Sequence, residues 1–222
     1  MQTLLIIGGV CLVGFMIYSS WKYHKERRAG FVAWAQKNNF RFRPERDRGL
    51  ANRFMFLNNL NNGSNRYGYD YLHGIYAGFT AHAFTYHYET YSTDSKGNRQ
   101  THHHNLGVVA IEIEQAFPEL RIHPESIFAK FGQLLGYDDI DFESIEFSKK
   151  YAVRSEDKKL AYDFCNTGMM EYLLKCPKTA LELDGHTLAV YDGAKLEPRE
   201  LDAYLLQLTE IRALMPAYLF KK

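Results

Sequence analysis

The spacing of hydrophobic and polar positions changes along the chain. Residues 3–21, from Thr3 to Trp21, form an uncharged run that is apolar on every face of a helix. At about 1.5 Å rise per residue this run spans roughly 28 Å, close to a bilayer hydrocarbon core of about 30 Å. The pattern therefore predicts a transmembrane helix at the N-terminus.

A period of about 3.6 residues follows and then gives way to a period of two. Residues 23–38 predict an amphipathic helix that continues the first one and ends at Asn38-Asn39. A short apolar segment at 54–60 and an Asn/Gly/Ser-rich loop at 58–65 come next. The period of two then predicts strands at 69–76, 78–91 and 101–114, the last two joined by a turn at 92–99.

The second half of the chain mixes helical and strand patterns. We expect a helix at 126–135, an acidic loop at 138–143 and a strand at 147–153. Two helices follow, at 156–165 and 169–175, with Ser155 and Thr167 as their N-caps. The chain then forms a hairpin of strands 179–183 and 187–191 around Asp184-Gly185-His186, and a helix at 199–215 opened by Pro198. The sequence thus predicts an α+β fold: an N-terminal transmembrane helix, then a mainly antiparallel sheet with packed helices and a C-terminal amphipathic helix.

The charge distribution gives the predicted anchor an orientation. The 222 residues carry a net charge of only +1, but residues 22–53 hold ten Lys and Arg against three acidic residues, whereas residues 1–21 hold no charge. Basic residues directly after an apolar run favour the cytoplasmic side. A cleaved signal peptide is the alternative, but it needs basic residues before the run and a small-residue cleavage site after it. We expect a single-pass protein of the inner (cytoplasmic) membrane whose domain faces the cytoplasm.

The same division predicts the domain organisation: an anchor at 1–21, a basic juxtamembrane helical segment at 22–53 and an α+β soluble domain at 54–222. In the juxtamembrane segment, Lys22, Lys25, Arg27 and Arg28 are the expected contacts with anionic lipid headgroups. The arginines at 41–53 reach lipid only if the chain folds back. Cys11, Cys165 and Cys176 lack metal-ligand spacing and are expected to be reduced packing residues.

Small and aromatic residues in the second half resemble a known pattern. The segments are Gly74-Ile75-Tyr76-Ala77-Gly78, 84–88, the run from Glu143-Ser144 through Tyr151-Ala152-Val153 to Ala161, 183–191 and the closing helix. They are similar to a family of uncharacterised bacterial membrane proteins, a domain of unknown function that follows one or two transmembrane helices. The resemblance covers most of residues 70–215 and implies no reaction and no catalytic residues.

The histidines are the sequence's main candidate for chemistry. The apolar face of strand 78–91 falls on even positions and that of strand 101–114 on odd positions. If these faces match in a hairpin centred near Ser95-Lys96, His87 lies opposite His104 and Glu89 opposite His102. These four side chains would form a candidate site for zinc or another first-row divalent metal. The alternative is a solvated polar face, and no cofactor is otherwise expected.

Other chemical signals are weaker. The acidic run Asp138, Asp139, Asp141 and Glu143 lacks the glycine and spacing of a calcium loop. His82 falls on the apolar face and is expected to be a core histidine with satisfied hydrogen bonds. No nucleophile elbow or phosphate-binding loop is present. The aromatic residues interleaved with arginines at 31–42 are typical of nucleic-acid binders, but beside an anchor they favour lipid contact or docking, so no nucleic acid is expected.

These observations favour a membrane-anchored accessory or interaction protein that binds lipid and another membrane protein or complex. Two other classes stay open: a metal-dependent enzyme or metal-binding protein that uses the histidine face, and a module that binds anionic lipid.

Overall fold

The computed structural model describes residues 2–95, 97–124, 140–176 and 179–220, and of these it leaves out the side chains of 2–11 and 59. The helices are α1 (Gln2–Asn38), α2 (Arg48–Arg53), α4 (Ile145–Lys150), α5 (Lys158–Phe164), α6 (Thr167–Lys175) and α7 (Leu201–Leu214), with short 3-10 turns η1 (Asn58–Leu60), η2 (Pro198–Glu200) and η3 (Ala217–Phe220). The strands are β1 (Arg41–Arg43), β2 (Ser64–Tyr76), β3 (Phe79–Thr93), β4 (Arg99–Pro124), β5 (Tyr151–Ser155) and β6 (Ala180–Asp192).

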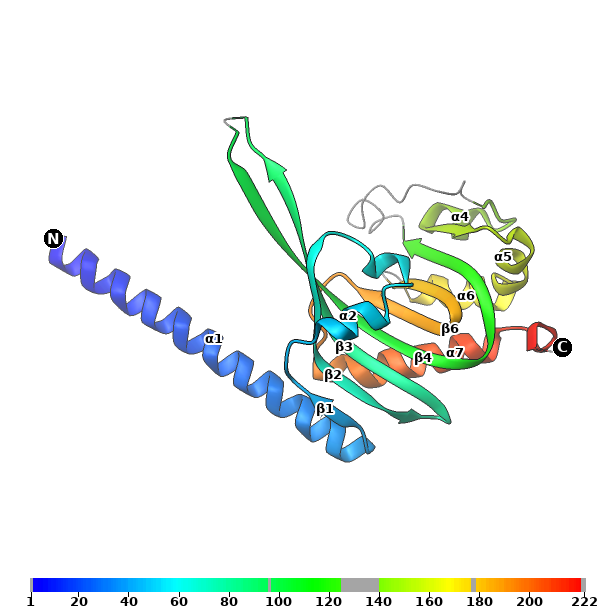
Figure 1. Cartoon of the computed structure of the whole chain (residues 1–222), viewed down its shortest axis with the longest axis horizontal. Helices are drawn as coiled ribbons and strands as arrows, with labels where there is room; N and C mark the ends of the chain where they lie inside the picture. Colours follow the sequence, from blue (N-terminus) through cyan, green and yellow to red (C-terminus); the bar gives the residue numbers. More distant parts are fainter. Residues whose placement is uncertain (1, 96, 125–139, 177–178, 221–222) are drawn as a thin grey trace.

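The described strands form one antiparallel six-stranded sheet, so the predicted α+β class with a mainly antiparallel sheet is confirmed. The strands β1, β2, β3 and β4 are neighbours in that order. The long strand β4 pairs with β6 along one edge, and with β3 and then β5 along the other. Beyond the sheet, β3 and β4 continue as a two-stranded hairpin that projects from the body (Figure 1).

The sheet is buried on both faces. One face carries the larger core, built from the end of α1, helices α4 to α7 and the odd-numbered side chains of β4 such as Val109 and Ile111. The other face carries a smaller core under α2 and η1, with even-numbered side chains such as Phe84 and Val108. Because both faces exclude water, both parities of β3 and β4 are apolar in the sheet, and parity alone does not fix the register.

Helix α1 is continuous from Gln2 to Asn38, so the predicted direct continuation is confirmed (Figure 1). It ends where Asn39 adopts a left-handed conformation with φ of 57°. The chain then folds back, and β1 pairs with β2. Phe31, Trp34 and Phe40 enter the larger core. Much of the predicted juxtamembrane segment 22–53 is therefore part of the folded domain.

Ala180–Asp192 form one strand, β6, rather than the predicted hairpin. Gly185 does adopt a positive φ, of 53°, but it lies opposite Phe117 at an irregularity in the pairing with β4. The Asp-Gly pair thus supplies a bulge where both strands bend, not a turn. Pro118 lies in the same irregular stretch of β4, which explains how that strand continues past its predicted end at residue 114.

The segment before β5 also differs from the prediction. Residues 147–150 belong to α4, whose N-cap Ser144 accepts a hydrogen bond from Phe147 N at 3.3 Å, and the strand begins only at Tyr151. The next two helices are capped by Asp157 and Asn166 instead of Ser155 and Thr167. The expected helix at 126–135 and residues Asp138 and Asp139 of the acidic loop lie outside the described residues. The closing helix forms as predicted.

Candidate functional site

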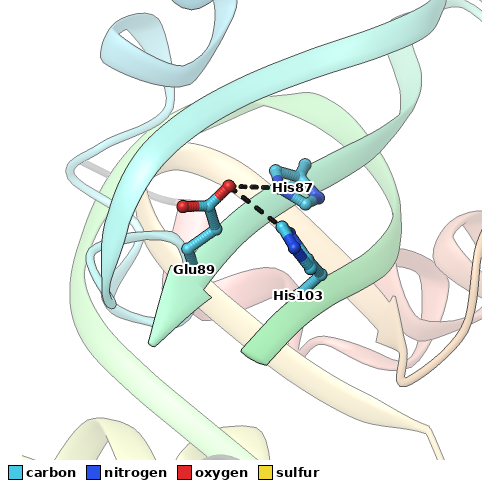
Figure 2. Close-up of side chains that lie close together, drawn as sticks. All are labelled: His87, Glu89 and His103. Atoms are coloured by element: carbon cyan, nitrogen blue, oxygen red, sulfur yellow. Dashed lines mark ion pairs between the residues drawn. The ribbon is translucent and has the colours of Figure 1, made fainter. Parts of the chain in front are cut away.

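The pairing of β3 with β4 brings three potential metal ligands to one face of the projecting hairpin. Glu89 lies directly opposite His103, and His87 lies opposite Asn105. Side chains two apart on a strand share a face, so the side chains of His87, Glu89 and His103 converge (Figure 2). We call these three residues the His-Glu-His cluster.

The distances in the cluster are short enough for a shared cation. Glu89 Oε1 lies 3.3 Å from His103 Nδ1 and 3.7 Å from His87 Nε2 (Figure 2). Each of the three residues offers one ligand atom, and these atoms all lie within 4.8 Å of one another. Among the described residues, these three form the group of His, Cys, Asp or Glu side chains close enough to share a metal ion. The side chains of His87 and Glu89 are 8% and 13% exposed, whereas that of His103 is 62% exposed. The His-Glu-His cluster is therefore buried at His87 and Glu89 and open to solvent at His103.

Neighbouring side chains fix the orientation of His87. Asn105 Oδ1 accepts a hydrogen bond from the Tyr69 hydroxyl at 3.2 Å and lies 3.3 Å from His87 Nδ1. Because that amide oxygen is an acceptor, His87 Nδ1 must be the protonated donor. The ring of Tyr67 stacks on His87 with a centroid separation of 4.6 Å. His87 Nε2 is thereby directed at Glu89.

The carboxylate of Glu89 is also held by donors. Asn65 Nδ2 donates to Oε1 at 2.7 Å, and the Tyr91 hydroxyl donates to Oε2 at 3.2 Å. These hydrogen bonds, the one from Asn65 foremost, lower the pKa of Glu89 from its ordinary value against the opposing effect of desolvation. Glu89 is therefore an anion with a fixed orientation at neutral pH.

The four-residue face predicted from the sequence does not form. His102 and His104 lie on the opposite face of the hairpin, where they bond Ser92 Oγ and Thr90 Oγ1, each at 2.7 Å. The predicted opposite pairs were wrong by one residue, because His104 pairs with Tyr88 and His102 with Thr90. The error came from matching the even face of one strand to the odd face of the other, although the sheet is apolar on both faces. No signal in the sequence favoured His103 over its neighbours.

The predicted lipid contact of Arg27 was wrong, because this side chain is buried in the domain. Its guanidinium pairs with Asp70, lies 3.3 Å from Glu197 Oε1, and donates to the Leu196 carbonyl at 2.6 Å and to Thr85 Oγ1 at 3.2 Å. A helix that crosses a domain surface buries one stripe, and Arg27 is one turn before Phe31 on that stripe. The sequence shows the basic cluster but not which of its members turns inward.

The other expected lipid contacts remain exposed. Lys22, Lys25 and Arg28 lie on the surface of α1. Lys25 Nζ lies 5.0 Å from the centroid of the Trp21 ring, and Lys22 makes an exposed ion pair with Glu26 at 3.8 Å. These contacts leave the charges solvated and close to the end of the apolar run.

The apolar part of α1 lies beyond the body of the domain (Figure 1). Several large apolar side chains are exposed around its circumference: Leu12, Val13, Phe15, Met16, Ile17, Tyr18 and Trp21. Among the residues open to description, no helix is long and apolar enough to cross a membrane. The side chains at 1–11, Thr3 included, are outside the described residues, so the anchor at 3–21 is not supported by this finding and stays a prediction.

His82 is a core histidine, as expected. It is fully buried and bonded by the Tyr71 hydroxyl at 2.8 Å and by Glu112 Oε1 at 3.0 Å. The aromatic side chains between residues 31 and 42 are likewise occupied, since Trp34 packs against Phe40 and Phe31 stacks on Phe42. They dock α1 on the domain, as the sequence allowed.

Comparisons with known proteins give a likeness in fold. No family model matches the sequence, and no curated protein does either. The crystal structure of the mycobacterial trehalose monomycolate transport factor A, TtfA, superposes with a TM-score of 0.62, over 86% of this chain and 95% of that chain. The sequences are 11% identical, so the likeness shows a shared fold alone.

Proposed function

We propose that the protein is a membrane-anchored accessory protein that binds another membrane protein, in support of a transport system. The observation that carries the proposal is helix α1, which joins an exposed apolar segment to the core of the domain without a break. The fold shared with a transport factor supports the transport association. The proposal includes a single pass through the inner membrane with the domain in the cytoplasm.

The exposed part of α1 supports the anchor. Six apolar side chains between residues 12 and 18 are between 50% and 70% exposed, and successive residues of a helix point about 100° apart. They therefore surround the helix instead of forming one stripe. Such a surface is costly in water, because each square ångström of exposed apolar area costs roughly 25 cal/mol, and lipid removes that cost.

The buried part of α1 supports a rigid attachment. Arg27, Phe31 and Trp34 are all buried against the domain. A Cβ atom on Gly30 would lie only 3.0 Å from Pro198 Cγ, so the helix backbone approaches η2 closely. The domain is thus fixed to the direction of the helix, and a membrane-inserted α1 would present one defined set of surfaces to a neighbour in the membrane.

Purification of the tagged full chain from membranes in mild detergent tests this function. We expect a membrane protein to copurify in stoichiometric amount. The matched control is a flexible Gly-Ser insertion between Trp21 and Lys22, which keeps the apolar run and the buried contacts of Arg27, Phe31 and Trp34 with the domain. If rigid presentation matters, the insertion lowers recovery of the partner at least several-fold while the protein stays in the membrane.

Two results contradict the proposal. One is the absence of any stoichiometric partner for the unaltered chain. The other is equal recovery of the same partner when the apolar run is made charged and the protein leaves the membrane, because the association would then not need the anchor.

A lipid-binding role is the second candidate, and it rests on Lys22, Lys25 and Arg28 at the end of the apolar run. Each exposed basic residue near an anionic leaflet gains about 1 kcal/mol. Hydrogen exchange of the full chain in nanodiscs tests it. Slower exchange at residues 22–30 in anionic than in zwitterionic lipid supports the role, and equal exchange contradicts it.

A further inference from the structure

We infer that His87, Glu89 and His103 bind one first-row divalent cation of the zinc class where the β3–β4 hairpin leaves the sheet. The inference does not depend on the proposed accessory function. It concerns a metal site whose ligands come from two paired strands and whose fourth position is open to water or to an external donor.

The hydrogen-bond polarity of His87 favours a bound cation. Its Nδ1 donates to Asn105 Oδ1, an oxygen that also accepts from Tyr69. In the neutral ring Nε2 then carries a lone pair, and it is directed at the Glu89 carboxylate 3.7 Å away. Two acceptors that face each other in a part-buried site repel unless a proton or a metal ion lies between them. A metal ion satisfies both, and the Asn105 contact is the kind of outer hydrogen bond that orients a metal-binding histidine.

The spacing of the donor atoms is also close to that of a tetrahedral metal site. Zinc lies about 2.0–2.1 Å from histidine nitrogen and about 2.0–2.2 Å from carboxylate oxygen, so neighbouring ligands of a tetrahedral ion lie roughly 3.3–3.5 Å apart. Of the two distances from Glu89 Oε1, the 3.3 Å to His103 Nδ1 matches this edge, and the 3.7 Å to His87 Nε2 is slightly longer. The remaining pair lies within 4.8 Å, and the side chain of His103 is 62% exposed.

The chemistry of the set also fits. Two imidazoles and one carboxylate suit zinc and its first-row neighbours, and they do not suit calcium or magnesium, which prefer oxygen ligands alone. Glu89 stays available as a monodentate ligand because Tyr91 bonds its other oxygen. Three protein ligands leave one tetrahedral position on the exposed side of His103.

A bound ion would join β3 to β4 at the base of the projecting hairpin. Beyond the Glu89–His103 pair the two strands have no further neighbours among the described strands, and their side chains at 91–93 and 99–102 are exposed. An isolated two-stranded hairpin is marginally stable in water. Coordination of both strands would order it and hold it at a fixed angle to the sheet.

Zinc titration of the metal-stripped full chain in detergent tests the inference, with content per chain measured by mass spectrometry of the metal. We expect one zinc per chain. His103→Gln should weaken binding at least tenfold, and its exposed position means that the substitution leaves the fold intact. His87→Gln should have the same effect, with circular dichroism as the check on folding.

The matched control is the double variant His102→Gln/His104→Gln, which alters the same histidine run on the opposite face. It should bind zinc as tightly as the unaltered chain. Absence of stoichiometric zinc from the unaltered chain overturns the inference. So does equal weakening by the His103 variant and the double variant, because the run itself would then bind the ion without regard to face.

Discussion

Arg27 of helix α1 forms a buried ion pair with Asp70 of strand β2, and this pair joins the helix to the sheet. Asp70 adopts a φ of 53° at an irregularity in the pairing of β2 with β3. A bulge of this kind redirects a side chain, and here it accompanies a carboxylate that meets the helix. The pair lies one helical turn from the core residue Phe31, at the point where α1 passes from the domain to its exposed segment.

Replacement of Arg27 by Met should therefore destabilise the domain by about 3–5 kcal/mol, because it leaves Asp70 buried without its cation. Chemical unfolding of the full chain in mild detergent measures the loss. Arg28→Met is the matched control, since Arg28 is exposed and should change the free energy of unfolding by about 0.5 kcal/mol or less. Equal effects of the two substitutions would contradict a structural role for the ion pair.

Gly30 gives a test of the close packing between α1 and η2. Substitution by Leu places side-chain atoms against Pro198, which already lies 3.0 Å from the ideal Cβ position. We expect a loss of about 1–3 kcal/mol, the usual cost of overpacking. Ala29→Leu, at an exposed neighbouring position of the same helix, is the control. Unchanged stability of the Gly30 variant would mean that the helix is not held against η2.

The stability of the domain should fall with acid through His82. Burial lowers the pKa of His82 from its ordinary value, and the charges of Arg53 and His73 lower it further. The hydrogen bond that His82 donates to Glu112 opposes this shift. Tyr71 bonds the other ring nitrogen. In the unfolded chain the ring titrates near pH 6.5, so the unfolded state binds the proton first as the pH falls. The contribution is complete above about pH 6.5 and is lost as the pH falls through the lower folded-state pKa.

Unfolding measured between pH 8 and pH 5 tests this relationship. His82→Gln should lower the stability at pH 8, because it disturbs the buried hydrogen bonds, and it should also reduce the decline toward pH 5. A variant with the same decline as the unaltered chain would show that another group causes the acid sensitivity.

Orientation in the membrane should depend on the exposed basic residues after the apolar run. A C-terminal alkaline phosphatase fusion should be inactive with the domain in the cytoplasm. Conversion of Lys22, Lys25 and Arg28 to Gln should raise its activity, since the positive-inside bias is weakened while Arg27 keeps its structural pair. High activity of the unaltered fusion would place the domain on the other side.

The sequence predicted the elements with a clear period better than their pairing. Helix 23–38, the three strands before residue 115 and the closing helix were found, because their apolar positions repeat over many residues. The register failed because Ala81 and Ala83 face one core while Phe84 and Tyr86 face the other. A sheet covered on both faces carries no alternation from which the register can be read.

For the candidate sites as well, the sequence indicated some of the residues but not their long-range contacts. The sequence singled out His87 and Glu89 through their place on one strand, but the choice of His103 depended on a one-residue shift that only the paired strands reveal. Similarly, the basic cluster was visible, but the inward turn of Arg27 depends on Asp70 and Glu197, which are distant in the sequence. Contacts of this range leave no local signal.

Alkaline carbonate extraction of membranes from cells that make the full chain tests whether α1 anchors the domain in the membrane. The unaltered chain should stay in the membrane pellet. Leu12→Asp/Phe15→Asp should move it to the supernatant, because a charged residue near the centre of a span costs about 2.5–3.5 kcal/mol. Recovery of the unaltered chain in the carbonate supernatant would show that α1 does not anchor the domain.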